Sequence, residues 1–236
     1  MKIETLADAD AVARAGAAFT AAEARAAIAA RGRFVVAFSG GHTPWTMLRA
    51  LADEQLPWAA VHVVQVDERV APAGDPDRNL THLRESLLER SPLLPEQIHA
   101  MPVESTDLNA ASGRYAVTLE EIAGSPAVLD LAHLGLGPDG HTASLVPGDP
   151  VLDVKDADVA LTGIYQGRRR MTLTYPVLNR SRRILWLVTG RDKAEMLPRL
   201  YEGDQSIPAG RISQQQAVVF ADHDAAARLG AERSQR

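Results

Sequence analysis

Residues 128–150 read VLDLAHLGLGPDGHTASLVPGDP, an apolar run that passes directly into a glycine-rich turn. The run from Val128 to Leu136 is typical of a strand that is buried on both faces of a parallel sheet. The turn carries Asp139 and His141. Because ligands of open α/β sheets bind beyond the carboxyl ends of the strands, this acid and this imidazole indicate a functional site.

Apolar segments alternate with helix-forming segments on both sides of this turn. The alternation predicts an α/β fold with a doubly wound, mostly parallel sheet and helices on both faces. We expect one domain over residues 1–236, because no long polar linker interrupts the chain. The expected strands cover residues 33–38, 61–66, 98–103, 128–136, 158–164, 168–174, 184–189 and 216–220, and the expected helices cover residues 7–31, 44–51, 80–89, 108–122, 192–201 and 225–230.

The composition argues against several functional classes. A hydrophobic fraction of 46% with 23% charged residues is ordinary for a soluble globular enzyme. The net charge of -5 gives no reason to expect nucleic acid or an anionic membrane as a partner. The absence of cysteine excludes disulfides and thiolate nucleophiles and is compatible with a reducing compartment. With no signal-like or membrane-spanning run, we expect a cytoplasmic protein. We also expect a monomer or a weak homodimer.

A second glycine loop follows the strand expected at residues 33–38. It reads SGGHTP over residues 39–44, and Pro44 can open the next helix. The N–H groups of a helix N-terminus, together with the hydroxyls of Ser39 and Thr43, suit a phosphate group. The alternative is that the two glycines make only a tight turn.

Charged residues follow other strand ends. Residues 67–69, Asp-Glu-Arg, come directly after a buried run, so they point into a crevice or into solvent. Arg69 suits bidentate phosphate binding or, alternatively, a structural ion pair. Lys193 is expected in the first turn of a helix, where it opposes the helix dipole unless an anion lies between them. Residues 168–170 are all arginine, and we expect at least one of them to approach the site. The alternative is that all three lie on a solvated face.

One motif suggests a cofactor that we reject. Residues 135–140, GLGPDG, fit the G-x-G-x-x-G fingerprint of dinucleotide binding. That fingerprint requires a long crossover helix, whereas Pro147 and Pro150 stop any helix after little more than one turn. The histidines of the chain show no metal-ligand spacing. We therefore expect no nicotinamide, flavin or other cofactor and no metal.

Four short segments form a recognisable set. They are SGGHTP at residues 39–44, DER at residues 67–69 with Asn79, GLGPDGHTASLVP at residues 135–147, and GRDKAE at residues 190–195. Together, in this order, they resemble the 6-phosphogluconolactonase family. The resemblance implies a modified Rossmann sheet similar to that of glucosamine-6-phosphate deaminases. It also implies hydrolysis of 6-phospho-D-glucono-1,5-lactone to 6-phosphogluconate in the oxidative pentose phosphate pathway.

The resemblance also suggests roles for individual residues. His141 would be the general base that activates water, since an imidazole titrates near neutral pH. Asp139 would orient the imidazole or hold the water; the alternative is that it only forms the turn. The residues expected to bind the substrate or its phosphate are Ser39, Gly40, Gly41, His42, Thr43, Asp67, Arg69, Asn79, Gly137, Arg170 and Lys193.

The chain departs from the family pattern at three positions. The family usually has serine at the positions of His42 and Arg78, and phenylalanine at the position of Val146. The deaminases have a glutamate at this last position that assists ring opening through the motif histidine, so valine favours the lactonase. Two alternatives stay open: a sugar-phosphate isomerase or deaminase of the same fold, and a non-catalytic sugar-phosphate sensor. Intact Asp139 and His141 argue against the sensor.

Overall fold

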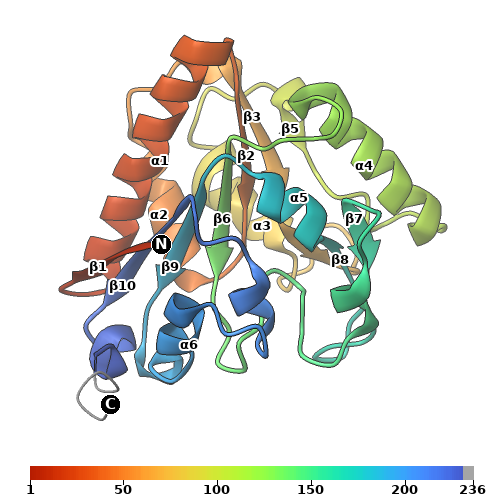
Figure 1. Cartoon of the computed structure of the whole chain (residues 1–236). Helices are drawn as coiled ribbons and strands as arrows, with labels where there is room; N and C mark the ends of the chain where they lie inside the picture. Colours follow the sequence, from red (N-terminus) through yellow and green to blue (C-terminus); the bar gives the residue numbers. More distant parts are fainter. Residues whose placement is uncertain (231–236) are drawn as a thin grey trace.

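A parallel sheet forms the centre of the molecule (Figure 1). The computed structural model describes residues 1–230, in which seven strands follow the order β1-β10-β9-β6-β2-β3-β5. All neighbouring strands of this sheet pair in parallel. Its strands are β1 (Lys2–Leu6), β2 (Phe34–Phe38), β3 (Val61–Gln65), β5 (Ile98–His99), β6 (Leu131–Gly135), β9 (Ile184–Val188) and β10 (Ala217–Asp222).

Helices cover both faces of the sheet, which confirms the doubly wound α/β fold. The α1 and α2 helices pack with Val36 and Leu131 on one face, and α4 and α5 pack with Ala132 and Leu134 on the other (Figure 1). No helix within residues 1–230 combines the length and the apolar character that a bilayer crossing requires. The helices are α1 (Ala9–Arg31), α2 (His42–Ala52), α3 (Asn79–Leu83), α4 (Leu108–Ala123), α5 (Tyr175–Arg180) and α6 (Met196–Glu202).

The long helix α1 shows why the local sequence predicts these elements well. The Asp8 carboxylate accepts a hydrogen bond from Ala11 N at 2.7 Å and caps the first turn. Gly32 ends the helix at φ +76° and donates its N–H to Ile28 O at 2.8 Å. The buried face is mostly alanine, so the helix backbone can approach the sheet closely.

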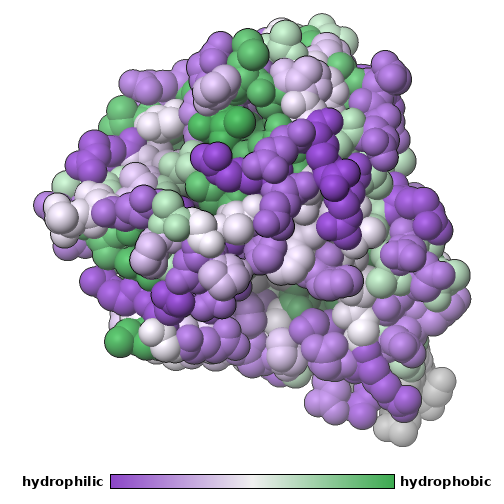
Figure 2. All heavy atoms as spheres, turned by 180° about the vertical axis from the view of Figure 1, so that it is seen from behind, coloured by the Kyte–Doolittle hydropathy of each residue, from purple (hydrophilic) through white to green (hydrophobic). Residues whose placement is uncertain are grey.

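Seen from behind, hydrophilic residues cover most of the surface and leave smaller apolar patches (Figure 2).

A second, antiparallel sheet lies beside the first. It consists of β4 (Asp67–Arg69), β8 (Arg170–Leu173) and β7 (Val159–Leu161), in that order. We expected residues 67–69 to point into a crevice or into solvent, and this was wrong for Glu68, which is fully buried in β4. The pairing of β4 with β8 joins segments far apart in the chain, so no local pattern reveals it.

Several boundaries differ from the sequence-based expectation. The strand β1 was not expected; it is an edge strand that forms because its backbone pairs with β10. The helix expected at residues 192–201 is a 3₁₀ turn at Arg191–Lys193 followed by α6. Lys193 therefore lies outside the first turn of an α-helix, and the helix-dipole argument does not apply to it. The helix expected at residues 225–230 is a 3₁₀ turn at Ala225–Arg228.

The buried carboxylate of Glu68 ties β4 to α3. Its Oε1 accepts from Asn79 N at 2.8 Å, and its Oε2 accepts from Leu80 N at 2.9 Å. Arg78, which is 2% exposed, places Nε 3.0 Å from Glu68 Oε2 and donates from Nη1 to Glu104 Oε1 at 2.9 Å. Arg78 thus serves in a structural ion-pair network, which explains why arginine can stand at a family serine position.

The central strand β6 carries a histidine with no exposed surface. His133 Nδ1 accepts a hydrogen bond from Ser39 N at 3.3 Å, and Ser39 Oγ donates to His133 O at 2.9 Å. Burial lowers the pKa of His133 to about 3. The ring is therefore neutral throughout the physiological range, and it joins β6 to the loop after β2.

This buried histidine makes the stability of the fold depend on pH. Below about pH 6.5 the unfolded chain binds a proton at His133 and the folded chain does not, so acidification favours unfolding. We expect His133 to remove about 1.4 kcal/mol of unfolding free energy per pH unit below that value. Urea denaturation from pH 7.5 to pH 5 measures this slope.

The matched variant for this measurement is His133→Asn, which keeps an acceptor near the Nδ1 position but cannot titrate. The variant should be less stable at pH 7.5, and its unfolding free energy should depend less on pH, by the slope that corresponds to one proton. Equal slopes for the two proteins would contradict the prediction.

Candidate active site

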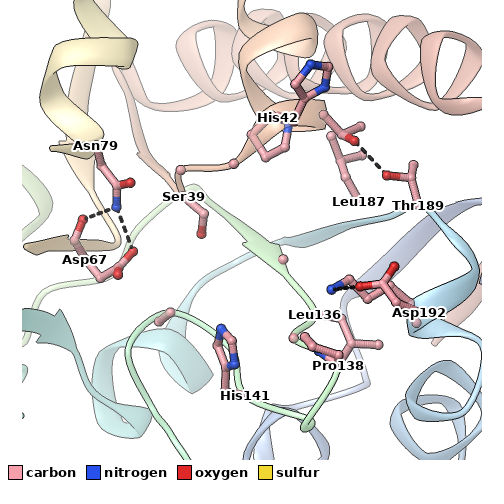
Figure 3. Close-up of a pocket in the computed structure, with 18 of the residues that line it drawn as sticks. Ser39, His42, Asp67, Asn79, Leu136, Pro138, His141, Leu187, Thr189 and Asp192 are labelled. Carbon is pink, nitrogen blue, oxygen red and sulfur yellow. Dashed lines mark hydrogen bonds and ion pairs between the residues drawn. The ribbon is translucent and has the colours of Figure 1, made fainter. Parts of the chain in front are cut away.

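A cavity of about 410 Å³ opens beyond the carboxyl ends of β2, β6 and β9 (Figure 3). The crevice between β2 and β6 is where the strand order reverses, the usual ligand position in open α/β sheets. The small sheet supplies a further wall through β4 and β8. The expected site residues that line the cavity are Ser39, Gly40, Gly41, His42, Thr43, Asp67, Arg69, Asn79, Gly137, His141, Arg170 and Lys193.

The turn after β6 holds the acid and the imidazole in contact. Gly137 N donates to His141 O at 2.8 Å and closes the turn, and Gly140 has φ +82°. A Cβ on Gly137 would lie 2.1 Å from His141 Nδ1, so only glycine fits beside this ring. Asp139 Oδ1 accepts from His141 N at 3.1 Å and lies 2.5 Å from His141 Nδ1.

This contact determines which nitrogen of His141 is available for chemistry. Partial burial on its own would raise the pKa of Asp139, but the charge and hydrogen bonds of His141 lower that pKa overall. An ionised carboxylate only accepts hydrogen bonds, so the ring proton lies on Nδ1 and Nε2 carries the lone pair. The Asp139 and His141 pair can therefore accept a proton at Nε2.

Two arginines from the small sheet border the cavity. Arg170 is 5% exposed, and of the three consecutive arginines it is the one that lines the cavity. Burial lowers the pKa of Arg170 and the charge of Asp67 opposes that shift, so the guanidinium stays charged. The Nε atoms of Arg69 and Arg170 are buried and have no hydrogen-bond partner within residues 1–230. Both guanidinium groups line the cavity, so a bound anion would meet their positive charge.

Lys193 supplies a third cation from the opposite side of the cavity. Its Nζ lies 2.7 Å from Asp192 Oδ2, and its side chain is 19% exposed while that of Asp192 is 60% exposed. An exposed ion pair of this kind contributes little stability. Lys193 can therefore exchange Asp192 for a ligand at small cost.

The loop after β2 differs in part from expectation. The Ser39 hydroxyl donates to the backbone of His133, and Thr43 Oγ1 lies 2.7 Å from Thr189 Oγ1. Both hydroxyls thus already have protein partners, so backbone N–H groups at the start of α2 are the better candidate donors for an anion. The exposed ring of His42 points away from His141 and lies 6.5 Å from Trp45, centroid to centroid (Figure 3).

The acid and the amide on the other wall are hydrogen-bonded to each other. Ser144 Oγ donates to Asp67 Oδ2 at 2.6 Å, and Asn79 Nδ2 donates to Asp67 O at 3.0 Å and Oδ1 at 3.2 Å. A Cβ on Gly40 would lie 1.9 Å from Asn79 Oδ1. The loop can approach the amide this closely because residue 40 is glycine and has no side chain. Asp67 is 4% exposed and shapes the cavity.

Several contacts were missed from the sequence. Thr189, Asp192 and Tyr165 each contact an expected site residue. The position of Thr189 directly after a buried strand could have identified it. Nothing local marks Tyr165, because its contact with Asp139 arises from tertiary packing. Among the described residues no cluster of three or more His, Asp or Glu side chains is arranged to hold a metal ion.

Sequence comparison places this geometry among known proteins. The family model described as glucosamine-6-phosphate isomerases/6-phosphogluconolactonase matches residues 7–220. The 6-phosphogluconolactonase of Synechocystis is 37% identical over 201 residues, which are 82% of this chain and 83% of the relative. That of Mycobacterium tuberculosis is 37% identical over 218 residues, 86% of this chain and 88% of the relative.

Solved structures agree with these matches. The 6-phosphogluconolactonase of Thermotoga maritima has a TM-score of 0.82 at 26% identity, covering 94% of this chain and 98% of that one. A monomeric glucosamine-6-phosphate deaminase has a TM-score of 0.84 at 20% identity, covering 97% of this chain and 100% of that one, and shows the shared fold. The chain belongs to the 6-phosphogluconolactonase family, within the glucosamine-6-phosphate isomerase superfamily.

Proposed function

We propose that the protein is a 6-phosphogluconolactonase, which hydrolyses 6-phospho-D-glucono-1,5-lactone to 6-phosphogluconate, with His141 as general base. The observation that carries the mechanism is the 2.5 Å contact between Asp139 Oδ1 and His141 Nδ1 at the edge of a cavity bordered by cations. This contact leaves His141 Nε2 free to take a proton. The identity of 37% with lactonases over most of the chain supports the substrate.

The reaction needs little beyond a base and a positioned substrate. A lactone carbonyl is already electrophilic, so water attacks C1 once a base accepts its proton. His141 Nε2 takes that proton as the C–O bond forms, and Asp139 stabilises the resulting imidazolium. When the tetrahedral intermediate collapses, the bond from C1 to the ring oxygen breaks and His141 returns the proton to that oxygen. Such assistance is worth roughly 10²- to 10⁴-fold in rate.

The three cations of the cavity provide the specificity for a phosphorylated substrate. Arg69 and Arg170 lie on the small sheet and Lys193 on the opposite side, so the substrate phosphate and carbonyl oxygen can both meet positive charge. Charge-assisted contacts of this kind are stronger than neutral ones. Val146 is 7% exposed and apolar, so it provides no carboxylate for the ring-opening chemistry of a deaminase.

The direct test is hydrolysis of freshly made 6-phospho-D-glucono-1,5-lactone by the purified protein in EDTA, compared with spontaneous hydrolysis and with the unphosphorylated lactone. We expect rapid loss of the phosphorylated lactone alone. Binding without turnover would instead support the sugar-phosphate sensor. Conversion of glucosamine 6-phosphate would support the deaminase.

The role of His141 is tested by His141→Ala. We expect kcat to fall by at least about 100-fold with KM nearly unchanged, because the variant lacks the proton acceptor but keeps the cations. His223→Ala, at an exposed histidine, is the matched control and should behave as wild type. Near-normal turnover of a folded His141→Ala protein would remove the proposed base.

Lys193→Ala should act on substrate binding instead. Loss of one charge-assisted contact should raise KM by roughly tenfold and leave kcat within a few-fold. Lys155→Ala, at an exposed lysine, controls for the loss of a positive charge. An unchanged KM for Lys193→Ala would place this lysine outside the phosphate site.

A further inference from the structure

The tight turn between β7 and β8 brings Tyr165 to the acid–base pair. Tyr165 N donates to Arg168 O at 3.0 Å, and Arg168 N donates to Tyr165 O at 3.3 Å. The two residues between them, Gln166 and Gly167, have φ +51° and +79°, as in the two-residue turns that match the twist of a hairpin. The turn therefore holds the tyrosine in a defined direction.

Ion pairs attach this turn to the rest of the site. Arg168 Nη2 lies 3.1 Å from Asp75 Oδ2 and 2.9 Å from Asp77 Oδ2, in the loop that follows β4. Arg69 Nη1 also donates to Asp77 O at 2.6 Å. The turn with Tyr165 is thus connected to the same loop that accepts a hydrogen bond from the cavity residue Arg69.

The Tyr165 side chain contacts an acid, a base and a cation of the site. Its hydroxyl donates to Asp139 Oδ2 at 3.3 Å. Its ring meets the ring of His141 edge-on, at 5.6 Å between centroids and an interplanar angle of 66°. The guanidinium carbon of Arg170 lies 5.0 Å from the ring centroid, within the range of a cation–π contact.

The contact with Asp139 is well placed to hold the carboxylate. Oδ1 of Asp139 is used by His141, whereas Tyr165 donates to Oδ2, so the two contacts together define the plane of the carboxylate. The Asp139 side chain is 37% exposed, so burial alone does not fix its orientation. Burial and the neighbouring Asp139 raise the pKa of Tyr165, which therefore keeps its proton and remains a donor.

We propose that Tyr165 is a positioning residue of this active site: its hydroxyl orients Asp139 toward His141, and its ring holds Arg170 in place for the substrate anion. The proposal rests on the proposed function. It separates the effects of two parts of one side chain. The hydroxyl acts on the proton-transfer step through Asp139, and the ring acts on substrate binding through Arg170.

Two variants separate these effects. Tyr165→Phe keeps the ring against Arg170 and removes only the hydroxyl, so kcat should fall roughly three- to tenfold with KM within about twofold. Tyr165→Ala removes both parts, so it should show the same loss of kcat and, in addition, a KM raised several-fold. Tyr201→Phe, at a tyrosine outside the cavity, is the matched control and should behave as wild type.

The pH dependence of kcat/KM distinguishes positioning from a wall that only shapes the cavity. The charged groups that share the cavity with His141 are Asp139 on its own turn, Asp67 and Arg69 on β4, Arg170 on β8, and Asp192 and Lys193 in the turn after β9. Without the Tyr165 hydroxyl, Asp139 is held less firmly against His141 and stabilises the imidazolium less. The acid limb for Tyr165→Phe should therefore move to lower pH, whereas loss of a wall alone would leave it in place.

The outcomes also distinguish this proposal from the proposed function. Lactone hydrolysis by the wild type, with reduced kcat and a shifted acid limb for Tyr165→Phe, supports the positioning role. A Tyr165→Phe protein with the kcat and pH profile of an active wild type overturns it. A folded wild type that does not hydrolyse the lactone contradicts the proposed function itself. Thermal melting of each variant shows that it is folded.

Discussion

The carboxylate of Glu68 is the constraint on which the site wall depends. It lies on β4 with no exposed surface and accepts hydrogen bonds from the backbone of Arg69, Asn79 and Leu80. Arg78 balances its charge at 3.0 Å. A buried charge is tolerated only with such complete pairing, and loss of one partner typically costs about 3–5 kcal/mol. The same contacts place Arg69 and Asn79 at the cavity.

Close approach of the backbone determines the rest of the geometry. Gly40 lies against Asn79, and Gly137 lies against His141, at distances that leave no room for a Cβ. These glycines bring two strand ends near the side chains of the cavity. The neutral, buried His133 links β6 to the β2 loop, so this contact adds no charge near the cavity. The charges that a substrate meets come from its walls.

The carboxylates and the arginines around the cavity differ in how they are paired. Asp139 is paired with His141, and Asp67 is held by Ser144, so both carboxylates have protein partners. The buried Nε atoms of Arg69 and Arg170 do not. In an environment of low dielectric constant, an unpartnered cationic N–H attracts an anion strongly. The cavity thus combines an acid–base pair that is already formed with arginine charges that no carboxylate of the acid–base pair neutralises.

The local sequence was sufficient for most of the parallel sheet, its longer helices and the position of the turn with Asp139 and His141. Hydrophobic runs, caps and glycine turns act over a few residues, so β2, β6, β9 and the turn with Asp139 and His141 could be predicted. The small sheet, the buried state of Glu68, the choice of Arg170 among three arginines and the contact of Tyr165 with Asp139 could not. Each of these depends on pairing between segments far apart in the chain, and such pairing exists only once the fold has brought them together.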